Sequence, residues 1–160
     1  IRGIADTNRQ SLAREAAIRY LDAICAVNND PAYGSIWECY SPTEHRPATA
    51  EAGEIVRADF VGWSGIAPVT MLIENIIGLR FDASRNTVTF DMFPGKTCGL
   101  RNMLFNGGKV SVECTEYIPV AGQSTICVEA EKPFTLVVKN NYAWGEYSFN
   151  VPAGKNLFRV

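Results

Sequence analysis

The stretch that decides the fold of the second half of the chain reads Asn106-Gly107-Gly108-Lys109-Val110-Ser111-Val112-Glu113-Cys114-Thr115. After the glycines, apolar and polar residues alternate as they do in a strand with one buried face, and the Asn-Gly-Gly start is typical of a hairpin turn. Six further runs of this kind follow or precede it between turn residues. The expected strands span residues 87–93, 100–105, 109–117, 125–131, 134–139, 146–151 and 157–160. Short strands at this spacing predict an antiparallel β-sandwich or sheet over residues 81–160.

The first half of the chain has the period of helices instead. Residues 6–28 place apolar side chains at three- and four-residue steps, with Asp6 or Thr7 as the expected N-cap. A second helix is predicted over residues 64–77, with Gly78 in the left-handed position that closes it. A long irregular stretch lies between the two helices, and such stretches inside a domain are usually functional. The fold class is therefore α+β, with a helical part over residues 1–80.

Composition excludes several classes of protein. The chain has 160 residues, of which 47% are apolar and 20% charged, with a formal net charge of −2, and these values are typical of a globular protein. The near-neutral balance without a basic run argues against a nucleic-acid partner or an anionic membrane surface. The longest apolar stretch, residues 66–79, is shorter than the roughly 20 residues that span a bilayer. Five scattered cysteines and one histidine predict free thiols in a reducing cytoplasm, not a disulfide framework or a zinc site.

The second predicted helix is apolar nearly all round, which is typical of a helix buried on several sides by other helices. Only two helices are predicted, and the first residue is Ile1, not Met. We therefore expect further helices upstream of Ile1 or from a partner chain. Without them, the chain is expected to expose a large apolar patch.

The candidate functional residues lie in and just after the long loop. Trp37, Glu38 and Tyr40 form one cluster, and Asp59 and Phe60 precede a small-residue turn that presents Trp63. Aromatic faces stack on pyranose rings, and a fixed glutamate can act as an acid, a base or a nucleophile, so this combination suits sugar chemistry. Packing of the two tryptophans in a core is the alternative, because large aromatic side chains are mostly buried.

Two motifs in this region resemble a known group of enzymes. The run Ile36-Trp37-Glu38-x-Tyr40-x-Pro42, then Phe60-x-Gly62-Trp63-Ser64-Gly65 and an apolar helix closed by Gly78, resembles the C-terminal part of inverting glycoside hydrolases with an (α/α)6 barrel. The resemblance is to family 63, with its α-glucosidases and mannosylglycerate-hydrolase-like members, and the trehalases of family 37 share a similar pair of motifs. It covers roughly residues 10–110. It implies that residues 1–80 hold the last helices and an active-site loop of the barrel, and that the β-sandwich is structural.

The resemblance also implies roles for single residues. Glu38 matches the general base that activates water, and Tyr40 and Trp63 match residues that shape the sugar subsite, with Phe60 close by. Trp37 and Asp59 are further candidates for substrate binding. The general acid of the family is an aspartate that lies well upstream of this motif, and none of Asp6, Asp22 and Asp30 matches it.

Inverting hydrolysis needs two carboxyls roughly 6.5–9.5 Å apart, and this chain supplies one. The expected function is therefore that of the C-terminal part of a hydrolase of α-glucosides or related α-glycosides, inactive alone and needing no cofactor. The alternative is a non-catalytic carbohydrate-binding or structural module that lacks the general acid.

Other singled-out residues have ordinary structural alternatives. Asp59 and Arg57 could orient Glu38 or bind a sugar hydroxyl, but a solvated ion pair is equally in keeping with their position. His45 is expected on the solvated loop, and nothing orients it toward Cys39 as a thiol–imidazole pair would require. An aromatic group near one strand end forms either a sugar-binding face or sandwich core, with core favoured; its members are Tyr142, Trp144 and Tyr147.

Overall fold

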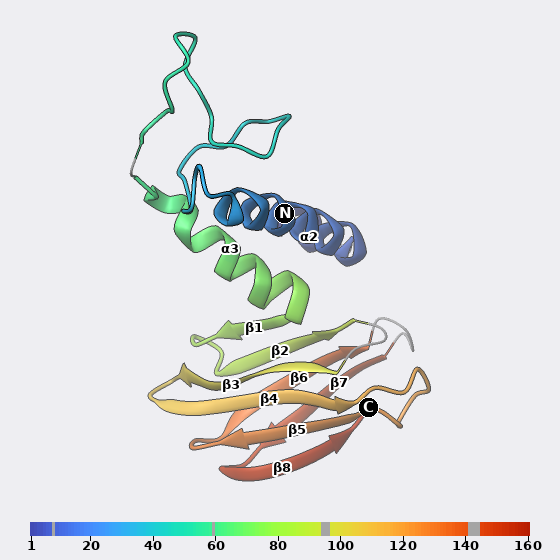
Figure 1. Cartoon of the computed structure of the whole chain (residues 1–160). Coiled ribbons are helices and arrows are strands. Elements are labelled where there is room, and N and C mark those ends of the chain that lie inside the picture. The colour runs from blue at the N-terminus through green and yellow to red at the C-terminus, as the bar shows by residue number, and fades with distance from the viewer. Residues whose placement is uncertain (8, 59, 94–96, 141–144) are drawn as a thin grey trace. The chain divides into compact units, whose positions relative to one another are not determined.

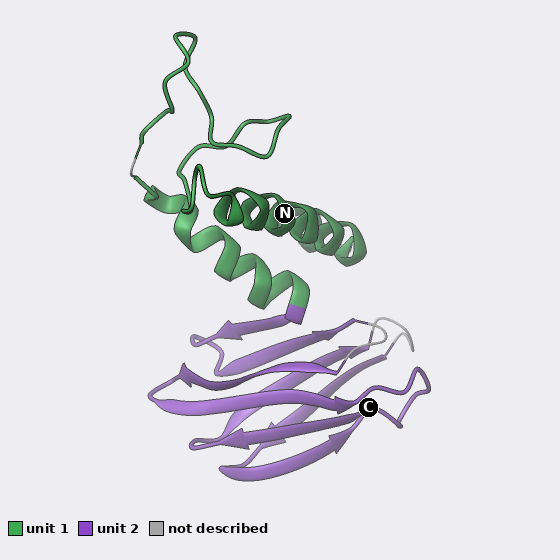
Figure 2. Cartoon of the chain, in the orientation of Figure 1, with its two compact units in different colours: residues 1–76 green, residues 77–160 purple. Residues whose placement is uncertain are grey.

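A computed structural model describes residues 1–7, 9–58, 60–93, 97–140 and 145–160 of the chain. The chain divides into two compact units, a helical unit of residues 1–76 and a β unit of residues 77–160 (Figure 2). The boundary at 76/77 lies four residues before the expected one at 80/81. The fold is mixed, with helices in the first unit and strands in the second (Figure 1).

The first predicted helix is present but begins later than expected. A short helix, α1 (Arg2–Asp6), precedes the main helix α2 (Gln10–Asn29), which packs against it. The expected N-cap at Asp6 or Thr7 is wrong, because the Thr7 hydroxyl donates to the Ile4 carbonyl and closes α1 instead. The predicted buried face of α2 is confirmed, and its innermost residues are Ala13, Ala17, Ile24 and Val27.

The second predicted helix is continuous but changes its winding. It starts as the 3-10 turn η1 (Gly62–Gly65), continues as α3 (Ile66–Met71) and ends as the π-helical turn η2 (Leu72–Ile77). Gly78 follows with φ +91°, which confirms the predicted left-handed closure.

One side of the second helix is exposed within this chain, and its burial by helices from upstream of Ile1 or from a partner chain stays a prediction. Trp63, Ile66, Val69 and Leu72, spaced three residues apart, are exposed, and we call them the apolar row. The reason is that α2 is the helix packed against α3 in the described structure, so one side of α3 is left uncovered. The predicted exposure of apolar surface is thus present.

The β unit has eight strands instead of the predicted seven. They are β1 (Leu79–Asp82), β2 (Thr87–Met92), β3 (Cys98–Phe105), β4 (Gly108–Glu116), β5 (Thr125–Ala130), β6 (Phe134–Asn140), β7 (Gly145–Val151) and β8 (Gly154–Arg159). The strand that was not predicted, β1, follows Gly78 directly and pairs with β2. The turn between them is held by the Asp82 carboxylate, which accepts from the amides of Ser84 and Arg85.

The strands form two four-stranded sheets, in the orders β1-β2-β6-β7 and β3-β4-β5-β8. Five of the six pairings are antiparallel, whereas β2 and β6 run parallel, with Val88 opposite Leu136. The expectation of a wholly antiparallel sandwich is therefore wrong at this pair. The chain leaves the first sheet after β2 and returns to it only at β6, and that excursion permits the parallel alignment.

The two sheets face each other across an apolar core. Phe105 of β3 lies between Phe81 of β1 and Phe134 of β6, with ring centroids 5.7 and 6.1 Å apart, and Phe149 of β7 meets Phe158 of β8 at 4.5 Å. Each pair joins one sheet to the other, so the architecture is a β-sandwich. The most deeply buried residues of this core are Val88, Phe90, Met92, Val112, Ile126, Val128, Leu136, Val138 and Val151.

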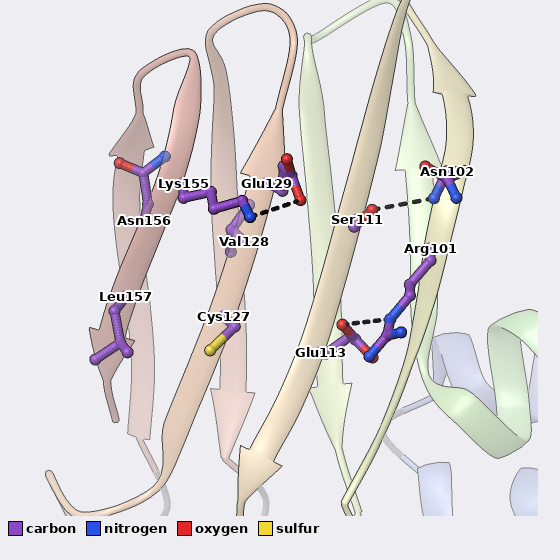
Figure 3. A pocket seen from close by; sticks show the side chains of 10 residues that line it. All are labelled: Arg101, Asn102, Ser111, Glu113, Cys127, Val128, Glu129, Lys155, Asn156 and Leu157. Carbon is purple, nitrogen blue, oxygen red and sulfur yellow. Dashed lines mark hydrogen bonds and ion pairs between the residues drawn. The ribbon is translucent and has the colours of Figure 1, made fainter.

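The outer face of the sheet β3-β4-β5-β8 is hollowed. A concavity of about 560 Å³ is lined by polar side chains from all four strands (Figure 3). We call it the sheet hollow.

None of the described helices is both long and apolar enough to cross a membrane. The five cysteines are free thiols.

Candidate functional site

The structure brings the two sequence motifs together in the helical unit. The carboxylate of Glu38 lies directly over Gly62, where an added Cβ would stand 2.8 Å from its Oε1 and 3.0 Å from its Cδ. Gly62 has φ +50°, a conformation that suits glycine, so both its backbone and its missing side chain are needed at this contact. Only a glycine lets the helix start approach Glu38 this closely.

Backbone and hydroxyl hydrogen bonds fix this approach. The amide of Glu38 donates to the carbonyl of Phe60 at 3.1 Å, and the hydroxyl of Ser64 donates to the carbonyl of Glu38 at 2.7 Å. Both bonds join segments more than twenty residues apart in the chain. They hold the main chain of Glu38 against the first turn of the second helix.

The carboxylate of Glu38 is paired with a cation. Its Oε2 lies 3.2 Å from Nε of Arg57, and its side chain is only 15% exposed. Arg57 itself has φ +50° and places its guanidinium 5.7 Å from the centroid of the Phe60 ring. The left-handed backbone of an arginine is uncommon, and here it directs the side chain back toward the glutamate and the ring.

The aromatic side chains of the two motifs have different surroundings. Trp63 is 86% exposed and Phe60 is also exposed, and both belong to the segment whose Gly62 contacts Glu38. Trp37 is 8% exposed, which places it in the core of the helical unit, the alternative that the sequence left open. The hydroxyl oxygen of Tyr40 accepts from the amide of Trp37 at 2.9 Å, which leaves its proton free to be donated.

Tyr40 also lies near the first long helix. Burial, and secondly the neighbouring Tyr40, raise the pKa of Tyr20 on α2 above its ordinary value. The Tyr20 phenol is therefore a protonated donor at neutral pH.

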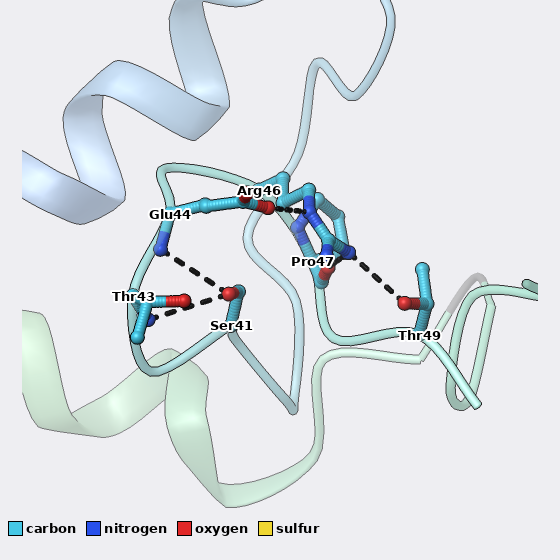
Figure 4. A network of polar contacts seen from close by, with 6 residues as sticks. All are labelled: Ser41, Thr43, Glu44, Arg46, Pro47 and Thr49. Carbon is cyan, nitrogen blue, oxygen red and sulfur yellow. Dashed lines mark hydrogen bonds and ion pairs between the residues drawn. The ribbon is translucent and has the colours of Figure 1, made fainter. Parts of the chain in front are cut away.

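The loop that carries Glu38 is braced by its own polar contacts (Figure 4). The Ser41 hydroxyl accepts from the amides of Thr43 and Glu44, and Arg46 bridges the Glu44 carboxylate and the Thr49 hydroxyl. Isolated bridges between Tyr40 and Pro47 and between Thr49 and Ile55 fold the loop back on itself. A long loop without regular strands is thus held in a defined shape.

The other residues predicted for the site are placed apart from Glu38 or fall outside the described residues. His45 is exposed on the loop, and in the described structure it makes no hydrogen bond with Cys39. Asp59, Tyr142 and Trp144 lie outside the described residues. Tyr147 is half-buried and stacks on Phe149, with centroids 6.5 Å apart, in keeping with the favoured role as sandwich core.

Ser64 is a positioning residue that sequence reasoning passed over. A hydroxyl in the first turn of a helix is a common hydrogen-bonding group, and here it reaches the carbonyl of Glu38. The serine next to the Gly-Trp pair is visible in the sequence, but the sequence does not show that its hydroxyl bonds to Glu38.

The arrangement can hold one carboxylate, paired with a guanidinium, beside two exposed aromatic side chains and a phenol. Such a group can take a proton from a water molecule while the rings bind an apolar sugar face. Among the described residues, no cluster of three or more acidic, cysteine or histidine side chains could hold a metal ion.

Comparison with known proteins identifies no family. No family model matches the sequence, and no solved structure matches the chain. The chain is similar to an uncharacterized protein of Borreliella burgdorferi, with 25% identity over 165 residues. The match covers 97% of this chain and 33% of that protein, so the chain spans about a third of the length of its relative.

Proposed function

We propose that these residues form the C-terminal part of an inverting glycoside hydrolase acting on α-glucosides or related α-glycosides, with Glu38 as the general base. The observation that carries the proposal is the seating of the Glu38 carboxylate on Gly62, beside the exposed rings of Trp63 and Phe60. The two motifs that resemble the glycoside hydrolases are joined by hydrogen bonds between residues 22 and 26 positions apart in sequence.

In the proposed reaction, Glu38 takes a proton from a water molecule. The water oxygen bonds to the anomeric carbon while the bond from that carbon to the leaving oxygen breaks, and the general acid gives that oxygen a proton. Arg57, with its Nε 3.2 Å from the carboxylate, would hold Glu38 in place for this step. Trp63 and Phe60 would bind the sugar faces, and the Tyr40 hydroxyl would donate to a sugar oxygen.

The general acid would come from outside these residues. Asp6 and Asp22 lie on α1 and α2, and the Asp30 carboxylate accepts from the amide of Ala32 at the end of α2, which gives it a structural role. The chain alone is therefore expected to be inactive.

The apolar row supports a further part of this proposal, that (α/α)6-barrel helices cover the second helix. Beyond Trp63, which is assigned to the sugar site, Ile66, Val69 and Leu72 are exposed along the second helix, and α2 packs against α3. A row of large apolar side chains in water is typical of a surface that another element buries. The covering helices would come from the remaining length of a longer polypeptide or from a partner chain of the same enzyme.

The test is hydrolysis of aryl α-glucosides and α-linked disaccharides by the longer protein that contains these residues. Glu38→Gln is expected to lower kcat by at least 10³-fold, because the amide cannot accept the proton from water. Glu51→Gln is the matched control, since Glu51 is exposed on the same loop and is expected to keep full activity. Proton NMR of the first product should show inversion at the anomeric carbon.

An unchanged rate in Glu38→Gln would refute the role of Glu38, and retention at the anomeric carbon would refute the inverting mechanism. No hydrolysis by the intact protein would favour the alternative, a carbohydrate-binding or structural module in which the Glu38–Arg57 pair only braces the loop.

A further inference from the structure

The sheet hollow lies entirely within the β unit and shares no residue with the Glu38 site. It is a concavity of about 560 Å³ on the outer face of β3, β4, β5 and β8, within the size range of small-ligand pockets (Figure 3). Side chains from these four strands converge on it. The ones that carry the argument are Arg101, Asn102, Ser111, Glu113, Lys155 and Leu157.

A bulge in β3 places two polar side chains where a regular strand would place one. Leu100 pairs with Val112 and Met103 with Val110, so Arg101 and Asn102 together oppose Ser111. Asn102 has φ +57°, and its backbone N–H donates to the Ser111 hydroxyl at 3.0 Å. Bulges of this kind redirect side chains next to binding and active sites, and the left-handed asparagine is a local strain that the sheet retains.

The charges that line the hollow are balanced. Arg101 pairs with Glu113 at 2.8 Å, and Lys155 lies 4.0 Å from Glu129. Two cations and two anions give no net field that would select an ionic ligand. The polar groups left over suit a neutral partner with many hydroxyls.

Several hydrogen-bonding groups in the hollow are free to bind such a partner. In the described structure, the side-chain amide of Asn102 makes no hydrogen bond, and Arg101 uses only its Nε on Glu113. Both groups are planar and can contact two neighbouring hydroxyls at once. Leu157, 61% exposed, supplies an apolar patch for the C–H face of a sugar ring.

From these contacts we infer that the sheet hollow binds a neutral oligosaccharide chain. The choice of an α-glucan rests on the proposed function, whereas the neutral, hydroxyl-rich class of ligand rests on the hollow itself. The β-sandwich would then hold a substrate chain in addition to its structural role.

The test is titration of the 160-residue chain with maltotetraose, followed by amide proton–nitrogen NMR. Shift changes are expected to cluster at residues 101–102, 111, 127–129 and 155–157. Asn102→Gly is the informative variant, because glycine accepts φ +57° without strain and only the side-chain amide is lost. Its dissociation constant is expected to rise about tenfold, which corresponds to about 1.4 kcal/mol.

The control is Asn86→Gly, the same substitution at φ +50° in the turn between β1 and β2 of the other sheet, which is expected to bind as the wild type does. Thermal unfolding of both variants reports whether they fold. No shift change at the hollow, an unchanged dissociation constant in Asn102→Gly, or tighter binding of the anionic trigalacturonate than of maltotetraose would each overturn the inference.

The two proposals fail separately. If Glu38→Gln abolishes hydrolysis but maltotetraose causes no shift changes at the hollow, the proposed hydrolase stands and the proposed sugar site in the hollow is refuted. If maltotetraose shifts the hollow residues but the protein hydrolyses no α-glycoside, the sugar site stands and the proposed hydrolase is refuted.

Discussion

Gly62→Ala tests the contact on which the candidate site depends. The substitution adds a Cβ at φ +50°, where a non-glycine residue loses about 1–2 kcal/mol. The same Cβ would stand 2.8 Å from Oε1, 3.0 Å from Cδ and 3.1 Å from Cγ of Glu38, well inside van der Waals contact. Glu38 must therefore swing away from Gly62 and from Arg57, which we expect to cost about 1 kcal/mol more, at the low end for overpacking because the end of the side chain can move.

Gly34→Ala separates the two effects. Gly34 has φ +48° in the same unit, and nothing lies within 4 Å of its added Cβ, so this variant carries the backbone strain without the collision. Urea unfolding of the 160-residue chain, followed by tryptophan fluorescence and by circular dichroism at 222 nm, gives the two losses of stability. Gly62→Ala should lose about 1 kcal/mol more than Gly34→Ala.

A double-mutant cycle with Glu38→Ala completes the test. With the Glu38 side chain gone, the additional loss in Gly62→Ala should vanish, which gives a coupling of about 1 kcal/mol. In the proposed hydrolase, the displaced carboxylate should lower kcat by roughly 10²-fold, as expected for a misplacement of about 1 Å. Equal losses for the two glycine variants, or no coupling with Glu38, would show that the carboxylate does not rest on Gly62.

Three further predictions use the same unfolding measurements. Trp37→Ala should destabilise the helical unit by about 3–5 kcal/mol, whereas Trp63→Ala should change its stability by no more than about 0.5 kcal/mol, because only the Trp37 ring is buried. Similar losses for both variants would contradict the placement of the two rings. Gly78→Ala should cost at least about 3 kcal/mol, since its Cβ would stand 2.1 Å from the backbone oxygen of Asp91 and neither strand can yield freely; a neutral effect would refute this close approach. Burial raises the pKa of the Cys114 thiol to about 11 from an ordinary 9.0, so the unfolded chain loses this proton first and the free energy of unfolding should fall as the pH rises from 9 to 11. Cys114→Ala should remove that part of the decline, and an unchanged pH profile in this variant would contradict the prediction.

The sequence predicted those strands whose signal is local. Asn106 and Gly107 have φ +47° and +71°, as a two-residue hairpin turn requires, and β3 and β4 meet there as expected. β1 escaped prediction because four residues directly after a helix are too few to establish a period. Its best signal was the Asp82 turn that follows it.

The sequence could not predict which strands pair when they are far apart in the chain. Neither the parallel alignment of β2 with β6 nor the face of the sheet that becomes hollow depends on residues close together in the chain. The bulge at Asn102 in particular depends on the shift in register between β3 and β4, from the pair Leu100–Val112 to the pair Met103–Val110.

At the candidate site, spacing alone could not show that Glu38 meets Gly62. That contact is made by hydrogen bonds from Ser64 and to Phe60, and it was anticipated only through the resemblance of the two motifs to a known family. The burial of Trp37 and the exposure of Trp63 could not be told apart from residue type, because both are tryptophans and large aromatic side chains are mostly buried.

The parallel pairing of β2 with β6 has a consequence for the order of events on the ribosome. Met92 pairs with Asn140, 48 residues later in the chain, and at about 5–20 residues per second those residues take roughly 2–10 s to be made. During that interval β1 and β2 can form only a two-stranded hairpin, which is marginally stable in water. The nascent chain therefore carries an unpaired edge of β2 directly behind the second helix until β6 emerges, and this interval is when a chaperone, or a neighbouring nascent chain, has access to that edge.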